Sequence, residues 1–304
     1  MGRRKRGQRI HGILVVDKPQ NFSSNAVLQR CRRALDAQKA GHTGALDPLA
    51  TGVLPICFGD ATKYSQYLLD ADKAYLADVC FGETRSTGDA EGEVLTQCDA
   101  SGLSQESVEQ ALDRFRGPIA QVPPMYSALK KDGKPLYKLA RQGIEIERPA
   151  REVTIYSLVL HDFKPGEQPV ARIAVRCSKG TYIRTLGEDI GAVLGVGAFL
   201  SGLRRTHAGP FDLSQALTLD QVESVGASVI DQLLPIDAGL SHLPRCVVDD
   251  HEAEKLLLGQ AVNVLNPSND GIVRIARVTH EFIGLGTVSE GHVLSPLRMI
   301  ATDE

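Results

Sequence analysis

Apolar residues follow two patterns along the chain, and both predict strands. Residues 12–19 (GILVVDKP) form a continuous apolar run ended by a turn, which predicts a buried strand, and residues 53–59 (VLPICFG) predict a second one. Three other segments alternate apolar and polar positions, which is typical of strands with one face in the core. These segments are residues 73–82, 151–163 and 169–180. We place residues 203–211 (LRRTHAGPF) in a further segment at the edge of the sheet.

Other segments repeat apolar residues at the spacing of a helix face. Residues 21–36 predict a helix capped by Ser23 or Ser24, and another helix is expected after Ser104. Two more helices are predicted over residues 61–69 and 181–195. Because strands and helices interleave without regular βαβ spacing, we expect an α+β fold with a mixed, mainly antiparallel central sheet and flanking helices.

Two breaks in these patterns indicate how the chain is divided. Residues 122–151 are basic, bounded by prolines and punctuated by tyrosines, which indicates a segment inserted between core elements. Near Leu243 a turn-rich junction is followed by short strands, which is typical of a small β-barrel. We therefore expect a basic N-terminal arm at residues 1–9, a main domain at residues 10–242 and a barrel at residues 243–304.

The composition is that of a globular protein. Its 304 residues are 42% hydrophobic, and no apolar run approaches the roughly 18 to 20 residues of a membrane span. A basic start followed by an apolar stretch imitates a signal peptide, but Asp17 and Lys18 end that stretch early, so we expect none. The six cysteines lack metal-ligand spacing, which favours reduced thiols in a cytoplasm.

Charge is distributed unevenly, and this changes which partners are plausible. The net charge of −3, taken alone, argues against a nucleic acid partner. However, five of the first nine residues are basic, and seven Lys or Arg oppose only three acids between Lys130 and Arg151. A solvated face is the ordinary explanation of such a run, and phosphate binding is the alternative.

One glycine-rich loop carries the clearest chemical signal. Residues 41–52 (GHTGALDPLATG) combine turn formers with a single formally charged side chain, Asp47, so we expect the loop to hold one carboxylate in a set place. A P-loop is disfavoured because the next lysine is the distant Lys63. The segments at His251 and His280 begin like zinc-protease helices but lack a second histidine, so no metal site is expected. Taken alone, Asp47 could equally be a turn former that bonds backbone amides.

Two downstream segments bear on that choice. CSKGTYIRTL places Tyr182 and Arg184 at the start of a predicted helix, where an inward-pointing arginine would need an acidic partner. LRRTHAG places Arg204 and Arg205 directly after Leu203. Taken singly, arginines at such positions are more often surface or structural residues.

The order of these motifs strongly resembles the bacterial TruB family, the tRNA pseudouridine-55 synthases. The match runs from GHTGALDPLATGVLPICFGDATK through KAYLADVCFGE, VPPMYSALKKDGKPLYKLARQGIEIER and CSKGTYIRTL to LRR, over about residues 10–240. The resemblance implies the α+β pseudouridine synthase fold with a C-terminal PUA-like RNA-binding barrel. It also implies an isomerase that cleaves the N1–C1′ bond of a uridine and rejoins the base through C5, without a metal ion or another cofactor.

The resemblance assigns roles to individual residues. Asp47 would be the catalytic carboxylate, and Arg184 would keep it ionised. The acid would attack C1′, add to C6 of uracil, or remove the 2′ proton, and of these routes we favour the last. Tyr75 would stack on a uracil flipped out of the RNA. Three further residues would complete the pocket around the extruded nucleotide. They are His42, Tyr182 and Leu203.

The implied substrate is the T stem-loop of tRNA. The basic insertion would hold its phosphates through Lys130, Lys131, Lys134 and Lys138. We also expect a monomer that acts in the cytoplasm, away from membranes and without a required protein partner. A guide-dependent rRNA pseudouridine synthase and a non-catalytic tRNA-folding chaperone are the alternatives. The insertion and the short barrel favour the tRNA enzyme over the first, and the set of Asp47, Tyr75 and Arg184 favours activity over the second.

Overall fold

The first apolar run forms a strand of a large mixed sheet, β1 (Gly12–Lys18), and residues 13–16 of this strand are almost fully buried. The computed structural model describes residues 7–264 and 270–301, and within them this sheet has ten strands. Its main path runs in the order β14 (Leu217–Thr218), β1, β3 (Thr51–Phe58), β12 (Ala198–Ala208), β4 (Lys73–Phe81), β11 (Val170–Cys177), β10 (Arg151–Lys164) and β7 (Gly117–Gln121).

Two short strands lie off this path: β2 (Ala40–His42) pairs with β3, and β13 (Phe211–Asp212) pairs with β12. Among the described strands of the sheet, β1 with β14 and β3 with β12 are the parallel pairs, and the other pairs are antiparallel. The predicted α+β class with a mixed, mainly antiparallel sheet is therefore confirmed.

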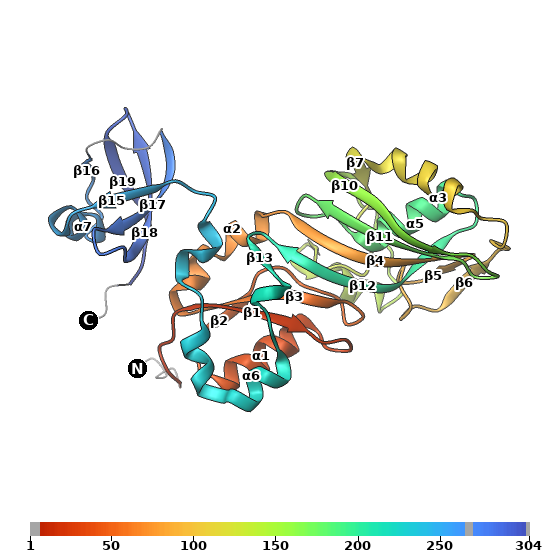
Figure 1. Cartoon of the computed structure of the whole chain (residues 1–304), viewed down its shortest axis with the longest axis horizontal. Coiled ribbons are helices and arrows are strands. Elements are labelled where there is room, and N and C mark those ends of the chain that lie inside the picture. The colour runs from red at the N-terminus through yellow and green to blue at the C-terminus, as the bar shows by residue number, and fades with distance from the viewer. Residues whose placement is uncertain (1–6, 265–269, 302–304) are drawn as a thin grey trace.

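Helices cover the two halves of this sheet separately (Figure 1). At one half, α1 (Ser24–Ala34) packs beside α6 (Leu219–Val225) and shares a buried core with β1 and β3. At the other half, α3 (Gln105–Leu112) and α5 (Ile183–Val193) share a core with β4, β10, β11 and β12. Leu186 of α5 and Val79 and Phe81 of β4 are fully buried there, and burying such side chains stabilises the fold by roughly 1.5 to 3 kcal/mol each. This core fixes the start of α5, where Arg184 lies.

The segment at residues 203–211 is not at an edge, so that expectation is wrong. It belongs to β12, which lies inside the sheet between β3 and β4. Its polar residues suggested an exposed edge, but Arg205 is only 1% exposed and donates from Nε to the carbonyl of Val53 at 2.7 Å. Gly52 makes this pairing possible, because its φ is +103° and a Cβ there would lie 2.1 Å from the Arg205 carbonyl oxygen.

The basic insertion leaves the sheet at the end of β7 and returns at the start of β10, where Gln121 and Arg151 are paired. It contains a hairpin of β8 (Lys130–Lys131) and β9 (Lys134–Pro135), followed by α4 (Leu136–Ala140). Both residues of the hairpin turn, Asp132 and Gly133, have positive φ, as a tight Asp-Gly turn requires. A second hairpin, of β5 (Glu83–Arg85) and β6 (Val94–Gln97), extends from the end of β4.

A separate five-stranded sheet forms a lobe at the C-terminal end of the chain (Figure 1). Its order is β15 (Arg245–Val248), β17 (Gly271–Arg277), β18 (Phe282–Ser289), β19 (Val293–Met299) and β16 (Val262–Asn263), and α7 (Asp250–Leu257) packs on its core. The strands predicted at this end are thus present. None of the helices in residues 7–264 and 270–301 combines the length and hydrophobicity of a membrane span.

The lobe is held to the main sheet through the turn η1 (Gly59–Tyr64) and the helix that follows it, α2 (Ser65–Asp70). The Tyr64 ring packs edge-on against Phe282 at 5.3 Å between centroids, and its hydroxyl donates to the carbonyl of Arg298 at 3.0 Å. The carboxylate of Asp60 accepts from the amide of Ala301 at 2.9 Å. These contacts dock the last strand, β19, onto the main domain.

Candidate active site

Asp47 lies in the glycine-rich loop between β2 and β3, which two neighbouring segments hold in place. The Ser24 hydroxyl both accepts from the amide of Leu46 at 2.7 Å and donates to its carbonyl at 3.0 Å. The amide of Asn21 donates to the carbonyl of Pro48 at 2.8 Å. The residues on both sides of Asp47 are therefore fixed to the start of α1 and the turn before it.

Lys18, at the end of β1, also holds this loop in place. Its ammonium group is fully buried and donates to the carbonyls of Phe22 at 2.6 Å, Pro19 at 2.9 Å and Pro48 at 3.4 Å. Burial lowers the pKa of Lys18 to about 8, and the negative charge of Asp47 partly offsets this effect. The lysine thus places a positive charge behind the Asp47 loop.

Arg184, in the first turn of α5, connects three segments at the site. Its Nε lies 3.0 Å from Oδ2 of Asp47 and 3.7 Å from Oδ2 of Asp89. Its Nη1 donates to the carbonyl of Thr87 and its Nη2 to the carbonyl of Tyr126, both at 2.7 Å. The guanidinium is buried, so its position is set by these four partners.

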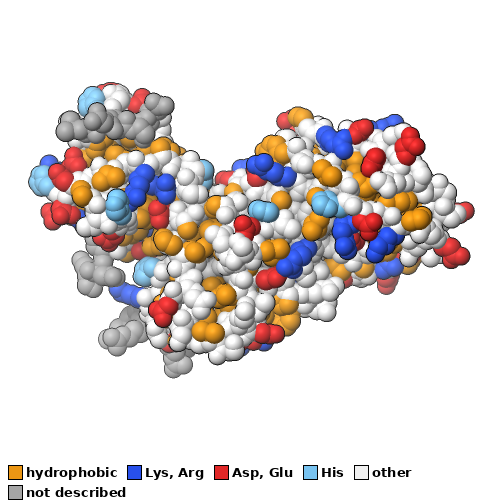
Figure 2. Space-filling view, viewed as in Figure 1, with side chains coloured by type: hydrophobic (Ala, Val, Ile, Leu, Met, Phe, Trp, Pro, Cys, Tyr) orange, Lys and Arg blue, Asp and Glu red, His pale blue; other side chains and the backbone are white. Residues whose placement is uncertain are grey.

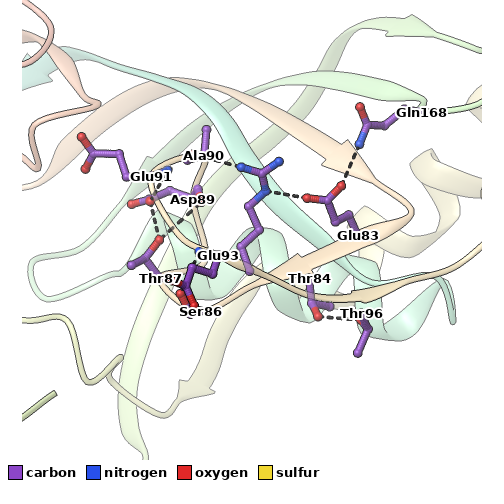
Figure 3. Close-up of polar contacts among 11 residues, drawn as sticks. Glu83, Thr84, Ser86, Thr87, Asp89, Ala90, Glu91, Glu93, Thr96 and Gln168 are labelled. Atoms are coloured by element: carbon purple, nitrogen blue, oxygen red, sulfur yellow. Dashed lines mark hydrogen bonds and ion pairs between the residues drawn. The ribbon is translucent and has the colours of Figure 1, made fainter. Parts of the chain in front are cut away.

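Asp89 comes from the loop of the β5–β6 hairpin, which Figure 3 shows in close-up. Its Oδ1 accepts from the Thr87 hydroxyl at 2.6 Å and from the amide of Glu91 at 3.1 Å, and the residue is 2% exposed. Arg85 steadies the loop by donating to the carbonyl of Ala90 at 3.0 Å. A second carboxylate therefore lies near the same Nε of Arg184 that faces Asp47.

The charge state of Asp47 reflects these opposing neighbours. The side chain is 43% exposed, so one side of the carboxylate is open to a ligand while protein surrounds the rest. Burial raises the pKa of Asp47 above its ordinary value, Arg184 opposes that rise, Asp89 adds to it, and Lys18 opposes it. Arg184 is thus the main group that favours the ionised form.

Tyr75, on β4, lies opposite Arg205 of β12 in the strand register. Burial raises the pKa of the Tyr75 phenol, whereas the charge of Arg205 and a hydrogen bond from it act in the opposite direction. Asp47 is close enough to raise this pKa a little further. The structure therefore brings Tyr75 to the side of the sheet on which Asp47 lies, with its hydroxyl beside a buried cation.

The remaining predicted pocket residues come from three elements. His42 ends β2, and its Nδ1 is buried without a hydrogen-bond partner among the described residues. Burial, then the charge of Arg205, lowers its pKa, which favours the neutral ring. Tyr182 directly precedes α5 and is half-buried. Leu203, on β12, pairs with Ala77 of β4 and, like Tyr75, packs against the buried core of this half of the sheet.

The four lysines of the insertion lie apart from this cluster, on β8, β9 and α4. Lys130, Lys131, Lys134 and Lys138 are all exposed, and no salt bridge to them is found among the described residues. Figure 2 shows one face of the molecule, on which basic and acidic side chains are interspersed. Exposed ammonium groups without an acid alongside are available to an anion.

The sequence did not mark three further residues of the site: Asp89, Arg205 and Lys18. The segment around Asp89 (DAEGEV) has the composition of an acidic surface loop, and only its tertiary contacts bury the carboxylate. Arg205 was noted after Leu203 but was not placed in the site, because isolated arginines are usually exposed. A lysine directly after a buried apolar strand was the one available signal for Lys18.

No group of three or more His, Cys, Asp or Glu in the described parts of the chain is placed to hold a metal ion. The site instead offers one accessible carboxylate, a buried arginine that faces it and a phenol nearby. Such a set can transfer a proton or form a covalent bond to a substrate carbon.

Comparison with known proteins places this site in a family. Three family models match consecutive parts of the chain: "TruB family pseudouridylate synthase (N terminal domain)" at residues 32–183, "tRNA pseudouridylate synthase B C-terminal domain" at residues 184–241, and "Pseudouridine synthase II TruB, C-terminal" at residues 244–300.

Similar proteins extend over almost the whole chain. The tRNA pseudouridine synthase B of Pseudomonas aeruginosa (strain UCBPP-PA14) is 55% identical over 296 residues, which cover 96% of this chain and 96% of that protein. The tRNA pseudouridine synthase B of Saccharophagus degradans is 49% identical and covers 99% of both. Among solved structures, a chain in the crystal structure of a Cbf5–Nop10–Gar1 complex superposes with a TM-score of 0.70 at 26% identity, over 96% of this chain and 85% of that one. On these grounds the chain belongs to the TruB family of pseudouridylate synthases.

Proposed function

We infer that this protein is a tRNA pseudouridine synthase, an isomerase that converts the uridine at position 55 of the tRNA T-loop to pseudouridine. The observation that carries this conclusion is 55% identity, over 96% of the chain, with a tRNA pseudouridine synthase B. The reaction breaks the N1–C1′ bond and forms a C5–C1′ bond, while a proton leaves C5 and another is taken up at N1. Because the product is an isomer of the substrate, no electrons are gained or lost.

We propose that Asp47 is the catalytic carboxylate. Its exposed side can meet the ribose or the base, and Arg184 at 3.0 Å favours the ionised form that each of the three chemical routes needs. Removal of the 2′ proton is the route we favour, with attack on C1′ and addition to C6 as the alternatives. A uridine inside folded RNA must first leave its stack, so the pocket has to accept a flipped nucleotide.

The residues around Asp47 take the supporting roles in this proposal. Tyr75 stacks on the flipped uracil, and Tyr182 and Leu203 complete the walls of the pocket. His42 lies against the extruded nucleotide, where its neutral ring avoids a charge in a partly buried position. Arg184 acts through Asp47 by keeping it ionised.

The insertion is proposed to hold the T stem-loop. Lys130, Lys131, Lys134 and Lys138 are exposed on one short hairpin and helix, where they can reach successive phosphates. Phosphate contacts position an RNA without reading its sequence, so selection of the uridine falls to the pocket. We propose the C-terminal lobe, residues 243–304, as a second RNA-binding unit beside a catalytic domain at residues 10–242. The N-terminal arm at residues 1–9 lies largely outside the described residues.

We further propose that the protein acts as a cytoplasmic monomer without a required protein partner, because its own insertion and lobe supply the RNA contacts. A guide-dependent synthase is disfavoured by sequence identity. The identity is 26% with the matched chain of the Cbf5–Nop10–Gar1 complex and 55% with the tRNA pseudouridine synthase B of Pseudomonas aeruginosa. A non-catalytic chaperone is disfavoured because it would not need a buried arginine aimed at an accessible carboxylate.

One assay tests this function. Purified protein is incubated with an unmodified tRNA transcript, and pseudouridine is mapped chemically along the RNA. We expect a single modified position in the T-loop, without added guide RNA. Modification elsewhere, or only with a guide RNA, contradicts the proposal, and binding without modification supports the chaperone.

A further inference from the structure

Gln121 joins the root of the insertion to the start of α5. It is the last residue of β7, directly before the insertion, and is 2% exposed. Its Oε1 accepts from the amide of Tyr182 at 3.1 Å, and its Nε2 donates to the carbonyl of the same residue at 3.3 Å. The side-chain amide thus pairs with both backbone groups of Tyr182, two residues before Arg184.

This pairing matters because α5 has no cap of its own at this end. Tyr182 occupies the N-cap position and its side chain makes no capping hydrogen bond. The orientation of the first turn, which carries Arg184, therefore depends on the buried Ile183 and Leu186 and on what holds Tyr182. Among the described residues, the side-chain amide of Gln121 meets both its N–H and its C=O.

A second connection runs from the insertion to the guanidinium itself. Arg184 donates from Nη2 to the carbonyl of Tyr126 at 2.7 Å. The next residue, Ser127, is buried, and its carbonyl accepts from the amide of Tyr137 in α4 at 3.1 Å. α4 carries Lys138, so hydrogen bonds link the helix proposed to meet RNA with the arginine that faces Asp47.

We propose that Gln121 is a positioning residue for the isomerisation, and that it couples docking of the insertion root (residues 121–127) to the Arg184–Asp47 pair. With the root docked, Arg184 has its full set of partners and holds Asp47 ionised. With the root released, the start of α5 and one partner of the guanidinium are lost together. RNA bound to the insertion lysines stabilises the docked root and so completes the active site. This inference rests on the proposed function.

The test is Gln121→Met, which removes both hydrogen bonds and keeps the side-chain volume. We expect kcat to fall by about tenfold on the acid limb of the pH profile and by a smaller factor at the alkaline end, because displacement of Arg184 lets the pKa of Asp47 rise. KM and the tRNA Kd rise by a smaller factor than kcat falls, because the lysines are intact but bound RNA must now also hold the root in its docked position. The matched control is Gln110→Met, at an exposed position on α3, which should behave as the unaltered protein.

The pH dependence of kcat reflects the charged and titratable groups near Asp47. Those groups are Arg184 and Glu188 from α5, Asp89 and Glu91 from the β5–β6 loop, Lys18 from β1, Arg205 from β12, His42 from β2, and the phenols of Tyr75 and Tyr182. Burial raises the pKa of Glu188 to about 6, so this carboxyl titrates in the range of the test. Gln121→Met leaves all of them in the chain. A change in the acid limb of the profile that persists in a Glu188→Gln background therefore reports displacement of Arg184 relative to Asp47.

An unchanged rate overturns the inference. A loss of the same factor at all pH values also overturns it, because it would mark a merely structural role. If Gln121→Met does not fold, Gln121→Asn decides, because it keeps the amide group but withdraws it from Tyr182 by one methylene and adds no charge. A smaller loss in the same acid direction is expected. Amide exchange in the unaltered protein gives an answer independent of folding: T stem-loop RNA should slow exchange at residues 182–186, and unchanged exchange there overturns the inference.

Failure of this inference is distinguishable from failure of the proposed function. If the unaltered protein does not modify the T-loop, the function itself is wrong. If it does, and both Gln121 variants match it at every pH, only the coupling is wrong.

Discussion

Arg184 and the two carboxylates it faces determine what the site can do. The guanidinium is shared between Asp47 at 3.0 Å and Asp89 at 3.7 Å, and both negative charges are partly or fully withdrawn from water. Burial is the largest influence on Asp47 and raises its pKa, so its ionised form is less favoured than that of a surface aspartate. The fraction of Asp47 in the ionised form therefore depends on Arg184.

Replacing Arg184 should therefore change the pH dependence of the reaction. In Arg184→Met the pKa of Asp47 rises further. At a pH below that pKa, each further unit of rise lowers the ionised fraction of Asp47 about tenfold. We expect the single-turnover rate to fall most at the acid end of the pH profile and to recover in part as the pH rises. Circular dichroism checks that the variant is folded. A profile lowered by one factor at every pH would show that the arginine positions Asp47 without tuning its charge.

Tyr75 allows the ring and the hydroxyl to be tested separately. Stacking of a base on an aromatic ring contributes roughly 1 to 3 kcal/mol, so Tyr75→Leu should weaken binding of tRNA with its uridine flipped, while Tyr75→Phe should retain affinity. Titration of fluorescent T stem-loop RNA measures both. Equal affinity of the two variants would contradict stacking. If Phe binds normally but is as inactive as Leu, the hydroxyl beside Arg205 has a chemical role of its own.

Part of the site could be predicted from the sequence and part could not. Asp47 stood out because a single charge in a loop of glycines and proline is a local feature. Asp89 did not, because its burial depends on a hairpin that folds back toward α5. Arg205 depends on the pairing of β12 with β3, where its partners are the backbone carbonyls of Val53 and Gly44. Such partners carry no signal in the sequence.

Among the elements, the insertion is the one whose charge differs from the rest of the chain. It begins and ends at residues of β7 and β10 that pair with each other, so the sheet is continuous without it. The alternating strands around it were predicted correctly, since half-buried strands alternate visibly. β12 was misplaced because its two adjacent arginines suggested an exposed edge, although Arg205 is buried.

The lysines of the insertion can be tested through salt dependence. Each phosphate contact contributes about 0.7 to 0.9 to the slope of log K against log salt concentration. Replacing Lys130, Lys131, Lys134 and Lys138 by Gln should weaken tRNA binding and flatten this slope by up to about four times that amount. Binding measured at several salt concentrations gives the slope. Lys164→Gln, at the far end of β10, is the control. An unchanged slope in the fourfold variant would show that the four lysines form a solvated surface and do not contact phosphates.

Across the whole molecule, Asp60 ties the C-terminal lobe to the main domain. Its carboxylate accepts from the Ala301 amide and lies 3.0 Å from the ammonium of Lys63. Burial acts to raise the pKa of Asp60, but these bonds outweigh it, and the pKa is lowered. The charged form therefore stabilises the fold above its unfolded pKa, and that contribution is lost as the pH falls through the folded pKa.

We expect Asp60→Asn to lower the free energy of unfolding by about 1.5 to 3 kcal/mol at neutral pH, as for a hydrogen bond to a charged group. The difference from the unaltered protein should shrink as the pH falls from about 5 to 3. Urea unfolding of both proteins at several pH values measures it. A difference that stays constant with pH would mean that the charge of Asp60 does not stabilise the docked lobe.

The account as a whole depends on one carboxylate, and Asp47→Asn is its most direct test. The amide keeps the shape of the side chain but cannot act as a base or a nucleophile. With a radiolabelled, unmodified tRNA transcript, single-turnover formation of pseudouridine at position 55 should fall by about four orders of magnitude or more, a typical upper range for loss of a general base. The tRNA Kd should stay within about threefold. Substantial turnover by the folded, tRNA-binding variant would contradict the assignment of Asp47 as the catalytic residue.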